Sequence, residues 1–167
     1  MMHLELDIEK ISRISKRKEN ENYRFRSFLK GQDSGRVDKI VHRLYKEIAE
    51  QIDCTDCGNC CKNLRPSVTD TEIDLLSKID NISHEDFETR FIEQDEIDQV
   101  KFLKDTPCKY LVDKKCAIYR ERPLDCKSYP HIHKKSFNSR TLGVLNNLEI
   151  CPIVFNVFER LKMEFRF

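Results

Sequence analysis

The sequence predicts a small, helix-dominated α+β fold: a single domain with a short β-hairpin, organised around a cysteine-bound metal site. A chain of 167 residues has the size of one domain with a real core. Glycine and proline together make up only 9 of those residues, below the usual share of roughly 12%, which favours helices over β-rich folds. The eight cysteines indicate the metal site.

The amino-terminal stretch, residues 1–31, predicts one or two amphipathic helices that stop at Gly31. Residues 10–30 carry eight basic side chains against two acidic ones, which fits either a solvated helix face or a nucleic-acid patch. The net charge of +1 favours the solvated face, so no nucleic-acid partner is expected. The apolar residues that recur at three and four are Ile8, Ile11, Ile14, Phe25, Phe28 and Leu29.

Three further helices follow from spacing and capping signals. A helix that begins at Asp33 or Ser34 carries apolar residues with helical spacing from Val37 to Ile52. Two cap patterns, Thr69 with Glu72 three residues later and Ser83 with Asp86, precede the other two helices.

The strongest β signal is a hairpin in residues 108–119 that carries one cysteine on each arm. A last amphipathic helix starts at Cys151 and Pro152, with apolar residues at Val154, Val157, Phe158 and Leu161. We therefore expect a helical part over residues 1–52, a metal-binding core over 53–152 and a terminal helix over 153–167 that packs on the core. These three parts together form one domain.

The amino terminus, Met-Met-His-Leu-Glu-Leu-Asp, has acidic residues where a signal peptide has basic and apolar ones. No run of 18 apolar residues occurs, so neither export nor a membrane span is expected. The expected compartment is the cytoplasm, where reducing conditions favour metal-ligating or redox thiols over disulfides.

The first cysteine cluster places Cys54, Cys57, Cys60 and Cys61 within eight residues. A C-x2-C turn brings two thiolates to one metal, and Gly58 permits the tight left-handed backbone of such a turn. C-x2-C-x2-C also matches the three consecutive ligands of bacterial-type iron-sulfur sites. Adjacent side chains are expected to diverge too strongly for one ion, so Cys61 indicates a second site, a multinuclear cluster or a thiol without a metal.

The other four cysteines are spread over 44 positions, so only folding can unite them. They are Cys108, Cys116, Cys126 and Cys151. Two histidines, His131 and His133, offer imidazole ligands, although surface or supporting roles explain them equally well.

Four stretches resemble the YkgJ-type cysteine-cluster family of zinc- or iron-chelating domains. They are Asp53-Cys-Thr-Asp-Cys-Gly-Asn-Cys-Cys61, Pro107-Cys-Lys-Tyr-Leu111, Cys116-Ala-Ile-Tyr-Arg-Glu-Arg-Pro-Leu-Asp-Cys-Lys-Ser-Tyr-Pro130 and Cys151-Pro152. The resemblance implies metal or iron-sulfur binding by all eight cysteines. It implies little about a substrate or a protein partner.

Three functions fit these residues. The first is a 4Fe-4S cluster in an electron carrier, a redox sensor or an iron-sulfur oxidoreductase subunit. The second is structural Zn²⁺ in a protein-interaction module. The third is thiol redox chemistry at a cysteine of low pKa, for which Cys151 at a helix start and Cys126 beside Lys127 are the candidates.

Overall fold

A computed structural model of the chain describes residues 4–167, and these divide into two compact units. The helical unit comprises the residues up to Asp53 together with Pro130–Phe167, and the cysteine unit comprises Cys54–Tyr129. No helix among the described residues is long and apolar enough to cross a membrane. The expected division into residues 1–52, 53–152 and 153–167 stays a prediction, and each unit is described by itself.

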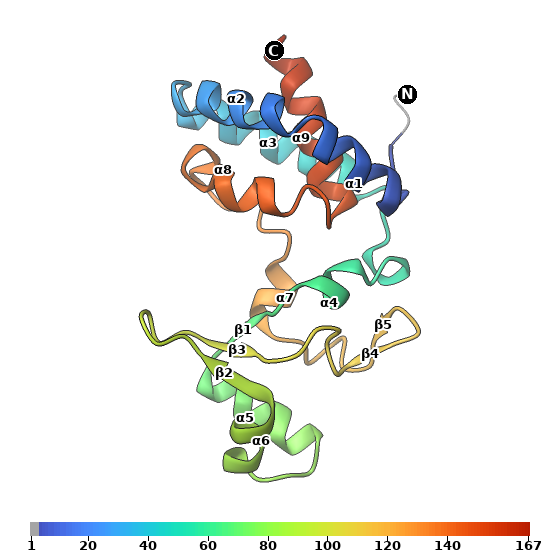
Figure 1. Ribbon diagram of the computed structural model, residues 1–167, viewed down its shortest axis with the longest axis vertical. Helices are drawn as coiled ribbons and strands as arrows, with labels where there is room; N and C mark the ends of the chain where they lie inside the picture. Colours follow the sequence, from blue (N-terminus) through green and yellow to red (C-terminus); the bar gives the residue numbers. More distant parts are fainter. Residues whose placement is uncertain (1–3) are drawn as a thin grey trace. The chain divides into compact units, whose positions relative to one another are not determined.

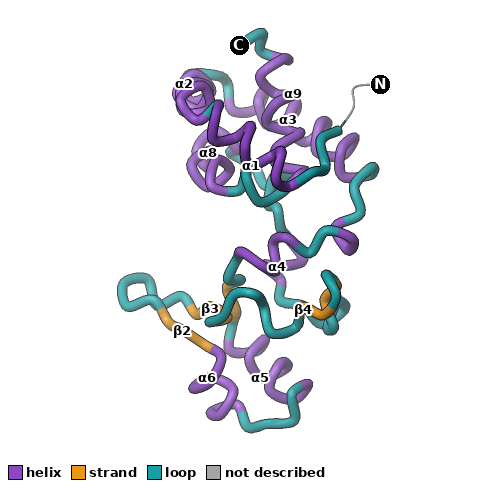
Figure 2. The backbone as a smooth tube through the Cα atoms, turned by 45° about the vertical axis from the view of Figure 1, so that its right-hand side comes forward, coloured by secondary structure: helices purple, strands orange, loops and turns teal. Residues whose placement is uncertain are grey.

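The helical unit is a bundle of five helices, of which the terminal helix is buried (Figure 1, Figure 2). Helix α9 packs on α3 and α1, while α8 packs on α2 and α3. The bounds are α1 Ile8–Arg17, α2 Glu19–Lys30, α3 Ser34–Ala49, α8 Phe137–Asn146 and α9 Pro152–Glu164. The predicted helix starts at Asp33 and Cys151 are confirmed, because these two residues are the N-caps of α3 and α9.

The core of this unit is aromatic and aliphatic. The rings of Phe25 and Phe158 meet edge to face with centroids 5.3 Å apart, a favoured aromatic geometry. The first seven residues of α9, Pro152–Phe158, are all buried, so this helix lies at the centre of the bundle. Its one polar member in that run, Asn156, accepts a bond from the Glu5 amide (3.0 Å) and donates to the Glu5 carbonyl (2.8 Å). The segment before α1 is thereby fixed to α9.

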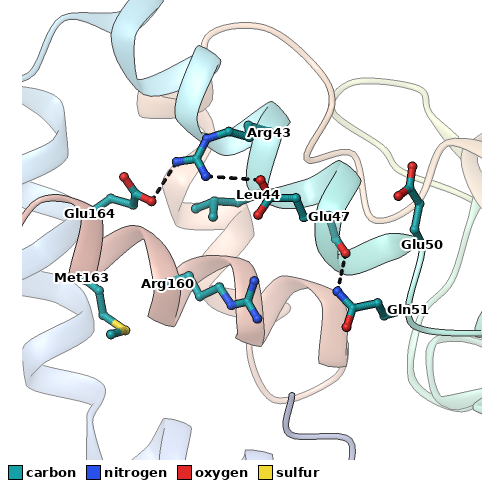
Figure 3. Close-up of a pocket in the computed structure, with 8 residues that line it drawn as sticks. All are labelled: Arg43, Leu44, Glu47, Glu50, Gln51, Arg160, Met163 and Glu164. Atoms are coloured by element: carbon teal, nitrogen blue, oxygen red, sulfur yellow. Dashed lines mark hydrogen bonds and ion pairs between the residues drawn. The ribbon is translucent and has the colours of Figure 1, made fainter. Parts of the chain in front are cut away.

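The predicted basic segment forms α1 and α2, and part of its charge is paired within the bundle. Lys18 bonds Glu159 of α9 at 2.5 Å, and Lys16 lies 3.5 Å from Glu149. A pocket lies between α3 and α9, where Arg43 bonds both Glu47 (3.3 Å) and Glu164 (2.7 Å) (Figure 3). This pocket contains no cysteine.

The cysteine unit combines a three-stranded antiparallel sheet, a two-stranded hairpin and short helices. The three-stranded sheet has the order β1-β3-β2 and was not predicted, because its strands are only two or three residues long. The bounds are η1 Cys54–Asp56, α4 Asn59–Asn63, β1 Ser67–Val68, α5 Asp70–Ile79, α6 His84–Phe91, β2 Ile92–Gln94, β3 Lys101–Leu103, β4 Leu111–Val112, β5 Lys115–Cys116 and α7 Leu124–Ser128.

A single apolar cluster holds this unit together, and two cysteines pack against it. Cys108 and Cys116 are the partly buried thiols at its edge. The buried members are Val68, Ile73, Leu76, Phe87, Leu103, Tyr110 and Ile118. Packing on this cluster gives Cys108 and Cys116 a fixed support.

Both predicted caps and the predicted hairpin are present. Thr69 and Glu72 form a reciprocal capping box at the start of α5, and the Ser83 side chain accepts a bond from the Asp86 amide at the start of α6. In the hairpin, Leu111 pairs with Cys116. The expectation of one cysteine on each arm is wrong for Cys108, which lies before β4 in a turn closed by the Leu111 amide on the Cys108 carbonyl (2.9 Å).

A buried ammonium in the helical unit gives a test of its packing. Lys162 Nζ donates to Glu21 (2.6 Å), Asn22 (2.6 Å) and Glu159 (2.7 Å). Lys162→Met leaves these acceptors without their donor, so we expect a loss of about 1–3 kcal/mol in the free energy of unfolding. Urea unfolding measures it, with the exposed Lys30→Met as control; equal losses in the two variants contradict the prediction.

The same contact predicts a pH dependence. The hydrogen bond from Lys162 holds the pKa of Glu21 below its ordinary 4.5, against the opposing effect of burial. Because the pKa of Glu21 is lowered in the folded state, the stabilisation from its contact with Lys162 is complete above about pH 4.5. It is lost as the pH falls through the lowered pKa. The stability difference between the wild type and Lys162→Met should therefore shrink in acid and stay constant from pH 5.5 to 8.

Candidate metal centre

Seven of the eight cysteines belong to the cysteine unit, on three segments of the chain. The segments are 54–61, 108–116 and the short helix α7, which carries Cys126. None of the eight, all within the described residues, takes part in a disulfide. Cys151 belongs to the helical unit, where it is buried at the N-cap of α9.

The first segment is a turn of helix η1 followed by α4, with Gly58 between them. Gly58 has φ +59° and is the N-cap of α4, which confirms the predicted left-handed backbone. Within α4, the sulfurs of Cys60 and Cys61 lie 3.9 Å apart. The expectation that these neighbours diverge too far for one ion is therefore wrong, since thiolates around a tetrahedral zinc lie about 3.8 Å apart.

The hairpin segment is joined to the first segment by backbone contacts. The Cys108 amide donates to the Cys61 carbonyl at 2.7 Å. A Cβ built on Gly58 would lie 2.5 Å from the Lys114 carbonyl oxygen, so the cysteine turn and the hairpin turn touch with no room for a side chain. Asp113 and Lys114 make that hairpin turn with φ of 46° and 68°, as a two-residue turn between twisted strands requires.

Helix α7, which carries Cys126, is anchored by two carboxylates. Glu72 of α5 accepts a bond from the Leu124 amide at 2.6 Å, and Asp125 accepts one from the Ser67 amide at 2.9 Å. A five-residue helix has several amides without an intrahelical partner, so these bonds fix its position. Asp125 is the second residue of α7, and its bond ties this helix to β1.

Four thiols from the three segments are close enough for their charges to interact. They belong to Cys61, Cys108, Cys116 and Cys126. Burial and the other thiolates raise the pKa of Cys108 and of Cys116 above 9, and they raise that of Cys126 to about 12. The expected low pKa of Cys126 beside Lys127 is wrong, because burial and the neighbouring negative charges outweigh the lysine.

Cys61 is the exception among the four. A hydrogen bond from Cys60, with the charge of Arg122, lowers the pKa of Cys61 to about 7 against the effect of burial. The guanidinium of Arg122 lies 3.7 Å from the centre of the Tyr119 ring and donates to the Tyr119 carbonyl at 3.0 Å. Arg122 is thus held beside the thiols, and it also favours the thiolate of Cys116.

Backbone amides point at two of the sulfurs. The amides of Tyr110 and Ile118 donate to the sulfurs of Cys108 and Cys116, each two residues earlier in the chain, and favour the thiolates. Soft sulfur donors with such amide bonds suit zinc or iron-sulfur clusters, and not the harder Ca²⁺ or Mg²⁺. The four thiols and their surroundings therefore fit a soft metal.

The two candidate histidines belong to the helical unit. The ring of His133 lies 6.0 Å from the centre of Tyr45, and burial lowers its pKa below 6.5. Whether His131 is a ligand stays a prediction. Sequence reasoning missed Glu72 as part of this centre; the Thr69 and Glu72 pattern indicated a cap but gave no sign that Glu72 also reaches α7.

A comparison with protein families matches residues 53–145, more than half of the chain, to the family described as "CxxCxxCC: Putative zinc- or iron-chelating domain". The chain belongs to this family. The expected family membership is confirmed, and with it metal binding at the coarse level of zinc or iron chelation. No curated protein and no solved structure matches the chain. All seven cysteines of the cysteine unit fall within the CxxCxxCC match, and Cys151 follows it.

The contact between Gly58 and Lys114 predicts a strict need for glycine. Gly58→Ala places a Cβ against a carbonyl oxygen and forces a left-handed residue, so we expect a loss of about 2–4 kcal/mol in stability and a lower metal content. Gly143→Ala is the control, since its Cβ meets nothing within 4 Å on helix α8 and should change stability by less than about 1 kcal/mol. Thermal unfolding and metal analysis measure the stability and the metal content of both variants. A Gly58→Ala protein with the stability and metal content of the wild type would refute the close approach.

The anchor of α7 predicts that Glu72 supports Cys126. Glu72→Ala removes the acceptor of the Leu124 amide, and we expect metal affinity to fall about tenfold because Cys126 is no longer fixed. Thr69→Ala is the matched control, since it removes the α5 cap alone and should cost about 1 kcal/mol of stability with little change in affinity. Competition with a chromophoric chelator measures affinity, and an equal effect of both variants would mean that Glu72 acts only as a cap.

Proposed function

We propose that this protein holds a 4Fe-4S cluster through its cysteines and uses it in electron transfer or cluster-dependent chemistry. The observation that carries the proposal is the meeting of four thiols from three segments. All eight cysteines remain candidate ligands, with Cys61, Cys108, Cys116 and Cys126 as the first set. Cys54, Cys57, Cys60 and Cys151 supply further thiols beyond the four that such a cluster requires.

The electrostatics of Cys108, Cys116 and Cys126 support a bound cation over a reactive thiol. Three of the four have raised pKa values, first because they are half-buried and then because each thiolate repels the others. A metal reverses this balance, since coordination deprotonates a thiol outright. Disulfide or peroxide chemistry at Cys126 lacks the low pKa that it needs.

The surroundings of the thiols support a cluster in particular. A thiolate-bound iron-sulfur cluster carries negative charge, and hydrogen bonds to sulfur together with nearby positive charge tune its potential. Arg122 and the amides of Tyr110 and Ile118 supply these interactions from the protein. Arg122 packs on the ring of Tyr119, whose side chain is exposed. Arg122 therefore lies near the surface, where a redox partner can approach.

Structural zinc is the second candidate, and the Cys60–Cys61 pair favours it. Their sulfur separation of 3.9 Å is close to the spacing of about 3.8 Å between two thiolates on one tetrahedral ion. In that case the metal would join α4 to the hairpin and α7, and the protein would act as an interaction module. Both the 4Fe-4S cluster and the zinc site need reduced thiols, and these suit the reducing conditions of the cytoplasm.

Anaerobic purification with an optical spectrum and with iron, zinc and sulfide analysis separates the two candidates. We expect a brown protein with a broad band near about 400 nm that dithionite bleaches, together with iron and sulfide in equal amounts. Cys126→Ser should lose most of the iron, whereas Leu124→Ala, an exposed residue on the same helix, should keep it. Colourless protein with stoichiometric zinc would overturn the cluster in favour of the zinc module.

A further inference from the structure

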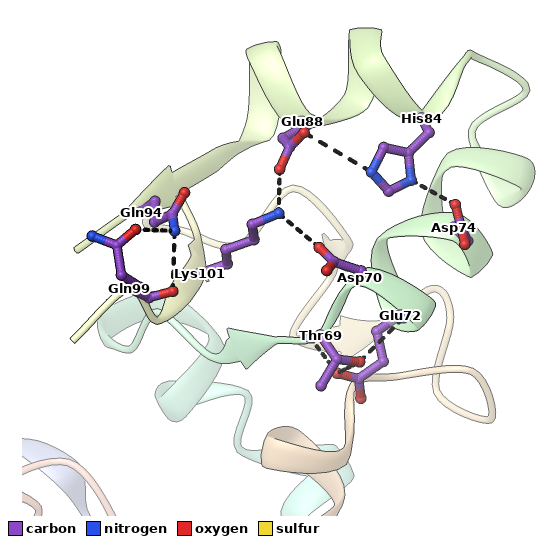
Figure 4. Close-up of polar contacts among 9 residues, drawn as sticks. All are labelled: Thr69, Asp70, Glu72, Asp74, His84, Glu88, Gln94, Gln99 and Lys101. Atoms are coloured by element: carbon purple, nitrogen blue, oxygen red, sulfur yellow. Dashed lines mark hydrogen bonds and ion pairs between the residues drawn. The ribbon is translucent and has the colours of Figure 1, made fainter. Parts of the chain in front are cut away.

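A second group of metal-ligating side chains lies at the start of α5 and α6 and contains no cysteine (Figure 4). Asp70, His84 and Glu88 each present one ligand atom, and these three atoms all lie within 4.8 Å of one another. Asp70 is the first residue of α5, and His84 is the first residue of α6 with Glu88 one turn later. The group therefore joins two helices of the cysteine unit.

The imidazole of His84 is oriented as a metal ligand. Its Nδ1 lies 2.5 Å from a carboxylate oxygen of Asp74. A carboxylate only accepts, so Nδ1 carries the proton and the lone pair of a neutral ring is on Nε2. Nε2 faces Glu88 at 3.9 Å, on the side where Asp70 also lies (Figure 4). A carboxylate behind the ring is the usual support of a metal-binding histidine.

The helix caps hold the three ligands in place. The capping box of Thr69 and Glu72 fixes the first turn of α5, and Ser83 caps α6. Between the two helices, the Phe87 side chain is fully buried in the core. The ligand positions are thus set by rigid elements and not by a loop.

A cation already lies between two of the carboxylates. Lys101 Nζ, from strand β3, lies 2.6 Å from Asp70 and 2.5 Å from Glu88. The contact shows that both carboxylates can turn to one positive charge. Two carboxylates share this one ammonium, and Asp74 faces His84 instead, so the carboxylates of the group outnumber the ammonium. The lysine side chain is 21% exposed, which leaves it a route to solvent.

We propose that Asp70, His84 and Glu88 form a second site for a divalent cation of the Mn²⁺–Zn²⁺ class, which replaces the Lys101 ammonium between the carboxylates. One imidazole and two carboxylates suit such ions, and they differ from the soft donors of the cysteines. Asp74 is a positioning residue for His84. The bound ion would link α5 to α6, and its remaining positions would be open to water or a ligand.

Mn²⁺ tests the site because it prefers oxygen and nitrogen and has little affinity for thiolates. The probe is an electron paramagnetic resonance titration of free Mn²⁺ on the full chain with its cysteine metal in place. We expect one bound Mn²⁺, about tenfold weaker binding in His84→Ala and Glu88→Gln, and about tenfold tighter binding in Lys101→Met, which removes the competing charge. Asp98→Asn, in an exposed acidic turn outside the group, is the control for charge and should leave binding unchanged.

Two outcomes overturn the proposal. The first is no Mn²⁺ binding below about 1 mM in either the wild type or Lys101→Met, with both proteins folded by circular dichroism. The second is binding that His84→Ala leaves intact, or that Asp98→Asn weakens equally, since this describes counter-ions on an acidic surface. Mn²⁺ binding to the wild type and the variants does not involve the thiols. A negative result for the cluster at the cysteines therefore leaves this test valid, and a negative result in this test says nothing against the cysteine centre.

Discussion

The close approach of Gly58 to Lys114 is the contact on which the cysteine unit depends. It brings the turn that carries the first cysteines against the turn of the hairpin, with carbonyl oxygen where any other residue would have a side chain. The Cys108 amide then bonds the Cys61 carbonyl, which places thiols that are 47 positions apart in sequence on the same side of the unit. Without that contact, the two cysteine segments would be independent loops, and Cys61 would not be held beside Cys108.

Two kinds of electrostatic imbalance result from this packing. Among the cysteines, burial and the neighbouring thiolates oppose ionisation. The charges of Arg122 and Lys109, the bond from Cys60 and a few amides favour the charged forms. At the α5–α6 pair, the carboxylates of Asp70 and Glu88 share one lysine, Lys101, while Asp74 faces His84. Both places favour a multiply charged cation, but sulfur donors select a soft ion, whereas oxygen and imidazole select a harder one. One small unit thus offers two coordination chemistries.

Helices were predictable here because their signals are local. Asp33, Thr69 and Ser83 each cap a helix through the amide three residues ahead, and the sequence shows both partners together. The three-stranded sheet was not predictable, because strands such as Ser67–Val68 are too short to show alternation. The cysteine ligands could be named from spacing, but not their grouping: burial sets the pKa of Cys126, and that burial comes from residues far away in sequence.

The two bonds of the Glu72 carboxylate bear on the order in which the elements of the cysteine unit fold. One of its carboxylate oxygens completes the cap of α5, and the other receives the amide of Leu124 in α7. The α5 contacts are local and form early in folding, while α7 arrives from 52 positions further along the chain. Helix α7, and Cys126 with it, is therefore fixed in place only once α5 has formed. We therefore expect the full set of cysteine ligands to be assembled only after α5 has formed.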